Sequence, residues 1–150
     1  MSMDRGVFLS IIGMTAGKPY QWGGESMQYG FDCSGLVRYG LMHAGFNIPD
    51  MSANDMCHKY FHLCKIMPEL AKPGDLYFYG KTADKINHVM IVFSVWQDRK
   101  KMLIGARGGN SETLSLDDAW NNRAYVDIVR GDYWKENLQI VVDPFMRKSL

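Results

Sequence analysis

The chain has 150 residues, a formal net charge of +1 from 17 basic and 16 acidic side chains, and 47% hydrophobic residues. This length and apolar content predict one domain over residues 1–150 with a core of its own. Because the charges are mixed and form no basic run, the composition favours neither a nucleic-acid partner nor an anionic membrane.

The first half of the chain shows a helical hydrophobic period and the second half shows the pattern of strands. Helices are expected over 3–16, over 33–44 and from Ser52, as N-cap, to about 64, with a loop over 18–31. Strands are expected over 75–79, 88–95, 102–106, 124–129 and 138–142. A polar loop over 80–87, a hairpin turn over 97–100 and a short helix over 116–121 complete the assignment. Helices followed by strands predict an α+β domain, with N-terminal helices packed on a central antiparallel sheet.

The apolar run over residues 7–14 could be read as a secretion signal. However, Val7, Phe8, Ile11 and Ile12 recur at helical spacing, so we interpret the run as part of the first helix. We therefore expect no signal peptide, and a protein that is cytoplasmic, phage- or virion-associated, or exported by a dedicated secretion system. No stretch approaches the ~20 apolar residues of a membrane helix. The sequence does not specify an oligomeric state.

The second predicted helix begins at Cys33, directly after the expected N-cap Asp32. Unpaired amide N–H groups and the helix dipole place partial positive charge at this end. That charge favours the thiolate, so the position predicts a lowered thiol pKa and a nucleophilic cysteine. A small, buried and unreactive cysteine is the alternative that the local pattern leaves open.

The other two cysteines, Cys57 and Cys64, are seven residues apart on the third predicted helix. That spacing corresponds to about 10 Å, which is too far for a disulfide, so all three cysteines are expected to be free. His58 and His62 lie on the same helix and are also zinc-ligand types. Four ligands on one straight helix cannot surround a single ion, so no metal is expected.

A cysteine nucleophile needs a general base within hydrogen-bonding reach. His43 follows Cys33 by ten residues on the same helix, about 15 Å along its axis, which excludes it. His58 and His62 are interpreted as structural. His88 opens the apolar strand over 88–95, at an edge from which its side chain can reach a helix terminus, although periodicity alone favours a structural strand histidine.

Four stretches together resemble the NlpC/P60 family of papain-like cysteine peptidases: Tyr20 with WGG at 22–24, FDCSGLV at 31–37, KPGDL at 72–76 and HVMIV at 88–92. They occur in the order of that family, and the resemblance covers roughly residues 5 to 110. It implies a papain-like fold and hydrolysis of an amide through a cysteine thioester. The implied substrate is a peptidoglycan stem peptide, cleaved at the γ-D-glutamyl bond to its diamino acid, without metal or organic cofactor.

The resemblance also implies roles for individual residues. Cys33 would be the nucleophile, His88 the base, and the Tyr20 hydroxyl would help the Cys33 amide to bind the oxyanion. Asp32 is either a plain N-cap or, with Ser34, a site that binds the free amine of a trimmed stem peptide, and both roles are compatible. Trp22 would line the same substrate site.

The chain departs from the family pattern at the third catalytic group, which orients the imidazole and is usually a histidine, sometimes Asn or Gln. The matching position is Gly105, before Ala106. Asn110 in the following loop is the first candidate to replace it, and a backbone carbonyl or a water are alternatives; Arg107 cannot accept a hydrogen bond. This departure leaves two rival hypotheses: an amidase or acyltransferase of the same fold acting on another substrate, and a catalytically weak binding or assembly module, as in a phage tail or an effector.

Overall fold

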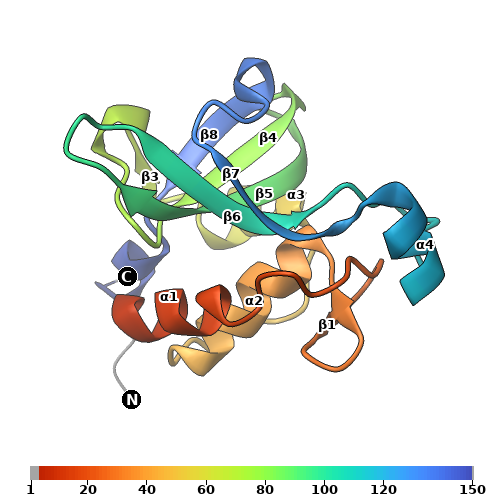
Figure 1. Ribbon diagram of the computed structural model, residues 1–150. Helices are drawn as coiled ribbons and strands as arrows, with labels where there is room; N and C mark the ends of the chain where they lie inside the picture. Colours follow the sequence, from red (N-terminus) through yellow and green to blue (C-terminus); the bar gives the residue numbers. More distant parts are fainter. Residues whose placement is uncertain (1–3, 150) are drawn as a thin grey trace.

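Two helices lie side by side against one face of a six-stranded sheet (Figure 1), in a computed structural model that describes residues 4–149. The helices are α1 (Arg5–Gly13) and α2 (Cys33–His43). The strands are β3 (Lys65–Ile66), β4 (Leu76–Thr82), β5 (Lys85–Val95), β6 (Lys101–Arg107), β7 (Tyr125–Arg130) and β8 (Leu138–Val142). Their order is β3-β8-β4-β5-β6-β7, and every neighbouring pair is antiparallel. The predicted α+β class, with helices on an antiparallel sheet, is confirmed.

Shorter elements connect these layers. A small hairpin, β1 (Glu25–Ser26) and β2 (Gly30–Phe31), precedes α2, and the short α3 (Ala53–Asp55) continues into a π-helical turn over Met56–Tyr60. The helix α4 (Leu116–Asn122) lies between β6 and β7 at one end of the molecule (Figure 1). Short 3-10 turns cover Pro68–Leu70, Lys135–Asn137 and Pro144–Ser149.

Several predicted boundaries are wrong. The first helix ends at Gly13 rather than 16, because the Thr15 hydroxyl donates to the Ile12 carbonyl and closes its last turn; residue 3 lies outside the described residues. The expected loop over 80–87 is instead a tight hairpin, since β4 runs to Thr82 and β5 starts at Lys85. The expected loop over 18–31 contains β1 and β2, and the third helix ends in its π-helical turn at Tyr60.

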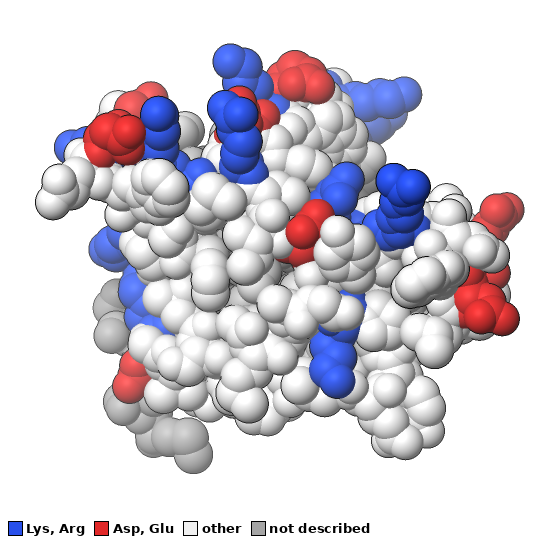
Figure 2. All heavy atoms as spheres, in the orientation of Figure 1, with Lys and Arg blue, Asp and Glu red and all other residues white. Residues whose placement is uncertain are grey.

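The two faces of the sheet bury separate sets of side chains. Val89 and Ile91 of β5 point toward the core under α1 and α2, whereas Met90 and Val92 point to the opposite face, where they pack with Tyr79. In the space-filling view (Figure 2), positive and negative side chains are interspersed over the upper half, and the lower half over α1 and α2 is largely uncharged. Adjacent residues of β5 therefore belong to different environments.

An ion-pair network fixes α1 to the sheet. Arg5 donates from Nη1 to Asp75 Oδ1 at 2.8 Å and to the Pro73 carbonyl at 2.7 Å, and from Nη2 to Asp143 Oδ1 at 2.6 Å. The Asp75 side chain is fully buried and its second oxygen accepts from the Lys72 amide. Asp75, the acidic residue of the KPGDL stretch, thus joins the first helix to the start of β4.

We expect Arg5→Met to lower the free energy of unfolding by about 3–5 kcal/mol, because it leaves the Asp75 carboxylate buried without its cation. Urea denaturation would measure this, with Lys59→Met as the control, since it removes only the exposed Lys59–Asp55 pair and should cost about 0.5 kcal/mol or less. Arg5→Met combined with Asp75→Asn should recover part of the loss. A loss in Arg5→Met no larger than in the control would contradict the network's role.

Candidate active site

The N-terminus of α2 is built around the Asp32 side chain. Its Oδ1 accepts from the Gly35 amide at 2.7 Å and, at 3.5 Å, from the Ser34 hydroxyl, while Oδ2 accepts from the Gly23 amide at 2.9 Å. Asp32 is therefore the N-cap, as predicted, and it also ties the preceding loop to the helix. Burial raises the pKa of the Asp32 carboxyl, while the Gly35 and Gly23 amides oppose that shift.

Gly35 allows the loop to lie directly on the first turn of α2. A Cβ at this position would collide with the Gly24 carbonyl oxygen and approach Asp32 Oδ1 at 2.7 Å. The Asp32 amide in turn donates to that same Gly24 carbonyl at 3.0 Å. Any side chain at position 35 would push the loop away from α2. The glycine of the DCSG stretch is therefore required for steric reasons.

Cys33 starts α2 with its thiol against β5. The backbone amides of Val89, Ser34 and Cys33 itself act on the sulfur and lower its pKa, but burial, and then the Asp32 carboxylate, outweigh them and raise the pKa to about 12. The predicted lowering of the thiol pKa is therefore wrong. The positive helix terminus is present, but Cys33 is also partly buried and lies beside a carboxylate.

Tyr20 and Trp22 flank this helix terminus from the loop. Tyr20 is 5% exposed, and burial raises the pKa of its hydroxyl, followed by the nearby charges of Cys33 and Asp32. The structure thus brings Tyr20 close to Cys33, as its predicted oxyanion role requires. Trp22 is 51% exposed, and its amide donates to the Thr113 carbonyl, which links this loop to the one before α4.

His88 lies on β5, next to the residue whose amide reaches Cys33. Its ring belongs to an aromatic cluster, with centroids 5.7 Å from Tyr79, 6.0 Å from Tyr133 and 6.1 Å from Trp134. Burial, and secondly the positive charge of Arg107, lower the pKa of His88 to about 4. With pKa values of about 12 for Cys33 and about 4 for His88, both groups are neutral at pH 7. None of the described hydrogen bonds joins His88 to Cys33, so their catalytic pairing stays a prediction.

The third catalytic group is not supplied by either expected position. A Cβ at Gly105 would lie 2.5 Å from Met90 Sδ, so the Met90 thioether occupies the space that a side chain at 105 would need. Asn110 is exposed in its loop, where its Oδ1 accepts from the Glu112 amide at 2.8 Å. Asn110 is therefore held in a local turn and does not orient His88 in this structure. Met90 was missed in the sequence, although a bulky residue on β5 beside a glycine on β6 is a recognisable cross-strand pattern.

The remaining histidines have structural partners. His43, His58 and His62 each use a ring nitrogen on a backbone carbonyl, those of Tyr39, Ala83 and Lys59 respectively. All three cysteines are free. Within residues 4–149, no group of three or more His, Cys, Asp or Glu side chains could hold a metal ion, and no helix is long and apolar enough to cross a membrane.

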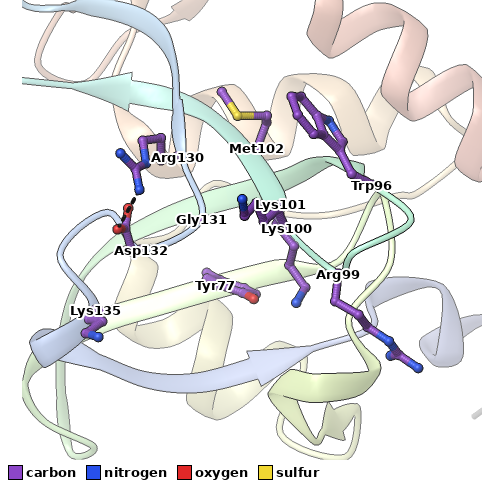
Figure 3. Close-up of a pocket in the computed structure, with 10 residues that line it drawn as sticks. All are labelled: Tyr77, Trp96, Arg99, Lys100, Lys101, Met102, Arg130, Gly131, Asp132 and Lys135. Atoms are coloured by element: carbon purple, nitrogen blue, oxygen red, sulfur yellow. Dashed lines mark hydrogen bonds and ion pairs between the residues drawn. The ribbon is translucent and has the colours of Figure 1, made fainter.

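A separate hollow of about 650 Å³ lies between the β5–β6 hairpin and the segment from Arg130 to Lys135 (Figure 3). Several Lys and Arg side chains surround it, and Arg130 and Asp132 form an ion pair of 3.5 Å at its edge. A second hollow, of about 520 Å³, lies beside α4 and includes Pro19 and Trp120. None of the residues predicted to form the catalytic site lines either hollow, so both are distinct from the region around Cys33.

A cysteine at the start of a helix that packs on an antiparallel sheet, with a histidine on a central strand, defines the papain-like class of α+β folds. Within that class the chain belongs to the NlpC/P60 family, whose model matches residues 17–143. It is 32% identical over 124 residues to the bifunctional muramidase/DL-endopeptidase CwlT of Bacillus subtilis, covering 81% of this chain and 31% of that protein. It is 38% identical over 120 residues to the murein DD-endopeptidase MepH of Escherichia coli, covering 73% of this chain and 40% of that protein.

Solved structures of the family show the same fold. The NlpC/p60 domain of the peptidoglycan hydrolase SagA superposes with a TM-score of 0.65 at 23% identity, covering 93% of this chain and 97% of that one. RipD of Mycobacterium tuberculosis, described as a non-catalytic NlpC/p60 domain protein, gives 0.57 at 22% identity, with 92% and 95% covered. The chain spans between about a third and two fifths of the length of CwlT and MepH.

We expect Asp32→Asn to lower the thiol pKa of Cys33, because it removes the adjacent carboxylate and keeps an oxygen that can cap α2. The rate of Cys33 alkylation by iodoacetamide at pH 8, followed by mass spectrometry, should rise several-fold. Asp98→Asn, in the exposed β5–β6 turn, is the matched control and should leave the rate unchanged. An unchanged or slower reaction in Asp32→Asn would contradict the electrostatic assignment.

The low pKa of His88 should make the free energy of unfolding depend on pH. The folded state holds this group at about 4 against an ordinary 6.5, so the unfolded chain takes up the proton more readily. His88 should therefore cost no stability above pH 6.5 and should destabilise the fold progressively as the pH falls from about 6.5 to about 4. Arg107→Gln should raise the His88 pKa, measured by an NMR titration, whereas Arg130→Gln should not. A wild-type His88 that titrates near 6.5 would refute the assignment.

Proposed function

We propose that this domain is a cysteine endopeptidase that hydrolyses an amide bond in peptidoglycan stem peptides, at the γ-D-glutamyl bond to the diamino acid. The observation that carries the proposal is the placement of the Cys33 thiol at the start of α2, beside the backbone amide of Val89, the residue that follows His88 on β5. The approach of the His88 imidazole to the sulfur is part of the proposal. The similarity to CwlT and MepH, both named as endopeptidases, supports this reaction class.

The proposed reaction starts from a neutral pair. Cys33 sulfur attacks the scissile carbonyl carbon while His88 takes the thiol proton, which gives a tetrahedral oxyanion bound by the Cys33 amide and the Tyr20 hydroxyl. The protonated His88 then donates to the leaving amine, and the C–N bond breaks to leave a thioester. Water, deprotonated by His88, hydrolyses the thioester and regenerates the thiol. A His88 pKa of about 4 makes it a strong acid for the leaving group and a weak base for the first step.

Asp32 and Ser34 are proposed to bind the free amine of the stem peptide. The Asp32 oxygens already accept from two amides and the Ser34 hydroxyl, but a carboxylate offers about four acceptor sites, so one remains for an ammonium group. That cation would neutralise the charge that is the second cause of the raised Cys33 pKa. Substrate binding would then favour the thiolate, and a stem peptide with an acetylated amine should be cleaved more slowly.

The half-exposed Trp22 supplies an apolar surface on the same loop.

A second candidate function is binding without efficient cleavage. It is favoured by Gly105 at the position of the third catalytic group and by the low basicity of His88. The description of RipD as non-catalytic and adapted to peptidoglycan binding gives this alternative a precedent in the same fold. An amidase or acyltransferase acting on another substrate remains the rival among enzymes.

Digestion of purified muropeptides, with mass spectrometry of the products, would test the proposal and identify the bond. Cys33→Ser should reduce cleavage by at least about 10³-fold, and His88→Gln by about 10²–10⁴-fold. His62→Gln, which alters an exposed histidine, should retain activity and is the matched control. Binding of muropeptides without cleavage would support the second candidate, and the absence of both would exclude the stem peptide as the substrate.

A further inference from the structure

Three buried polar atoms have no hydrogen-bond partner within the described part of the chain, and they belong to residues of one cluster. They are Tyr79 Oη, His88 Nε2 and Arg107 Nε. Tyr133 contacts all three residues: its ring centroid lies 5.8 Å from that of Tyr79 and 6.0 Å from that of His88, and 5.4 Å from Arg107 Cζ. Buried polar groups without partners are rare and costly, so three in one cluster indicate a site for a polar molecule.

The three side chains come from neighbouring strands on one face of the sheet. Tyr79 of β4 is the direct cross-strand partner of His88 on β5. Arg107 of β6 lies close enough for its charge to act on His88. Tyr79 is fully buried, and its ring stacks on Trp134 with centroids 5.8 Å apart and planes 21° apart. The position of the Tyr79 hydroxyl is therefore fixed by packing.

Tyr79 Oη could accept a hydrogen bond from His88 Nε2–H, but the two atoms are not bonded to each other and both are without a partner in the described part of the chain. The Met90 thioether fills the space beside Gly105 and is only a weak acceptor. Asp127, opposite Gly105 on β7, accepts from Arg107 Nη1 at 3.1 Å, and the Arg107 guanidinium lies over the Tyr133 ring, with Cζ 5.4 Å from its centroid. The nearby carboxylate is thus already used by the guanidinium.

The hydrogen-bonding capacity of the three atoms matches that of one water molecule. Arg107 Nε–H is a donor only, and His88 Nε2–H is a donor in the tautomer whose Nδ1 lone pair is free. A water can accept from both and donate to Tyr79 Oη, which gives it three partners, the usual number for buried water. Neither donor could satisfy the other directly.

We propose that a single water bound by Tyr79 Oη, His88 Nε2 and Arg107 Nε orients the imidazole in place of a third catalytic side chain, with Tyr79 as the positioning residue. The water accepts from Nε2–H and so holds the tautomer in which Nδ1 can take a proton. The water site and the tautomer do not depend on the proposed function. Only the step in which Nδ1 receives the Cys33 proton rests on it.

Two-dimensional NMR of the ¹⁵N-histidine-labelled protein would test the proposal, with His88 signals identified by their loss in His88→Gln. In the wild type at pH 7 we expect one tautomer, protonated at Nε2. Tyr79→Phe, which removes only the hydroxyl, should give a mixture in which the Nδ1–H tautomer is also populated. Tyr77→Phe is the matched control, because Tyr77 is a buried tyrosine on the same face of β4, and it should leave the signals unchanged. Unchanged His88 signals in Tyr79→Phe would overturn the proposal.

A high-resolution crystal structure would test the water itself. Density for one water within hydrogen-bonding distance of the three atoms supports the proposal, and direct protein partners for all three would overturn it. If muropeptides are cleaved, Tyr79→Phe should lower kcat about tenfold and leave KM unchanged. A variant in which kcat falls and KM rises by similar factors would indicate a merely structural role for Tyr79. If no cleavage occurs in any variant, the proposed function fails while the tautomer measurement still decides the water site.

Discussion

The carboxylate of Asp32 is the group on which the geometry of the candidate site depends. It caps α2, binds the loop through the Gly23 amide, and lies beside the thiol of Cys33. The same charge that fixes the position of the sulfur also opposes its ionisation. If Cys33 is the nucleophile, as proposed, a cation that neutralises Asp32 would remove the second cause of its raised pKa, while burial, the first cause, would remain.

The motifs of the chain divide between positioning the site and holding the fold together. The DCSG stretch forms the helix start, where Gly35 accommodates the loop carbonyl. The Asp75 of the KPGDL stretch lies in a buried network with Arg5 and Asp143, which ties the beginning of α1 to the start of β4 and the end of β8. β5, the second strand after this stretch, places the Val89 amide beside the thiol and the His88 ring in the aromatic cluster.

The hydrophobic periods were enough to predict α2 and the main strands, because alternation and the 3.6-residue repeat follow directly from burial on one face. They failed at the hairpin between Thr82 and Lys85, where polar residues at strand ends extend beyond the core. The lowered thiol pKa was also predicted incorrectly, since a helix terminus is visible in the sequence but the desolvation of Cys33 is not. Likewise, Gly105 revealed that the usual third group was missing, but the Met90 thioether beside it and the polar cluster around Tyr79 result from contacts between strands that the sequence does not show.

Cys33 and His88 lie in different environments on the two sides of the β5 backbone, and each environment determines the protonation state of its own group. On the helix side, burial and Asp32 keep Cys33 protonated; on the other side, burial and Arg107 keep His88 neutral. Both shifts disfavour an ion pair between the two groups, so in the proposed reaction the thiolate would form only after substrate binds. A stem-peptide ammonium at Asp32 would act on the first shift and leave the second unchanged. The charge of the substrate would thus affect how readily Cys33 releases its proton. The orientation of the imidazole would determine whether His88 Nδ1 can accept that proton.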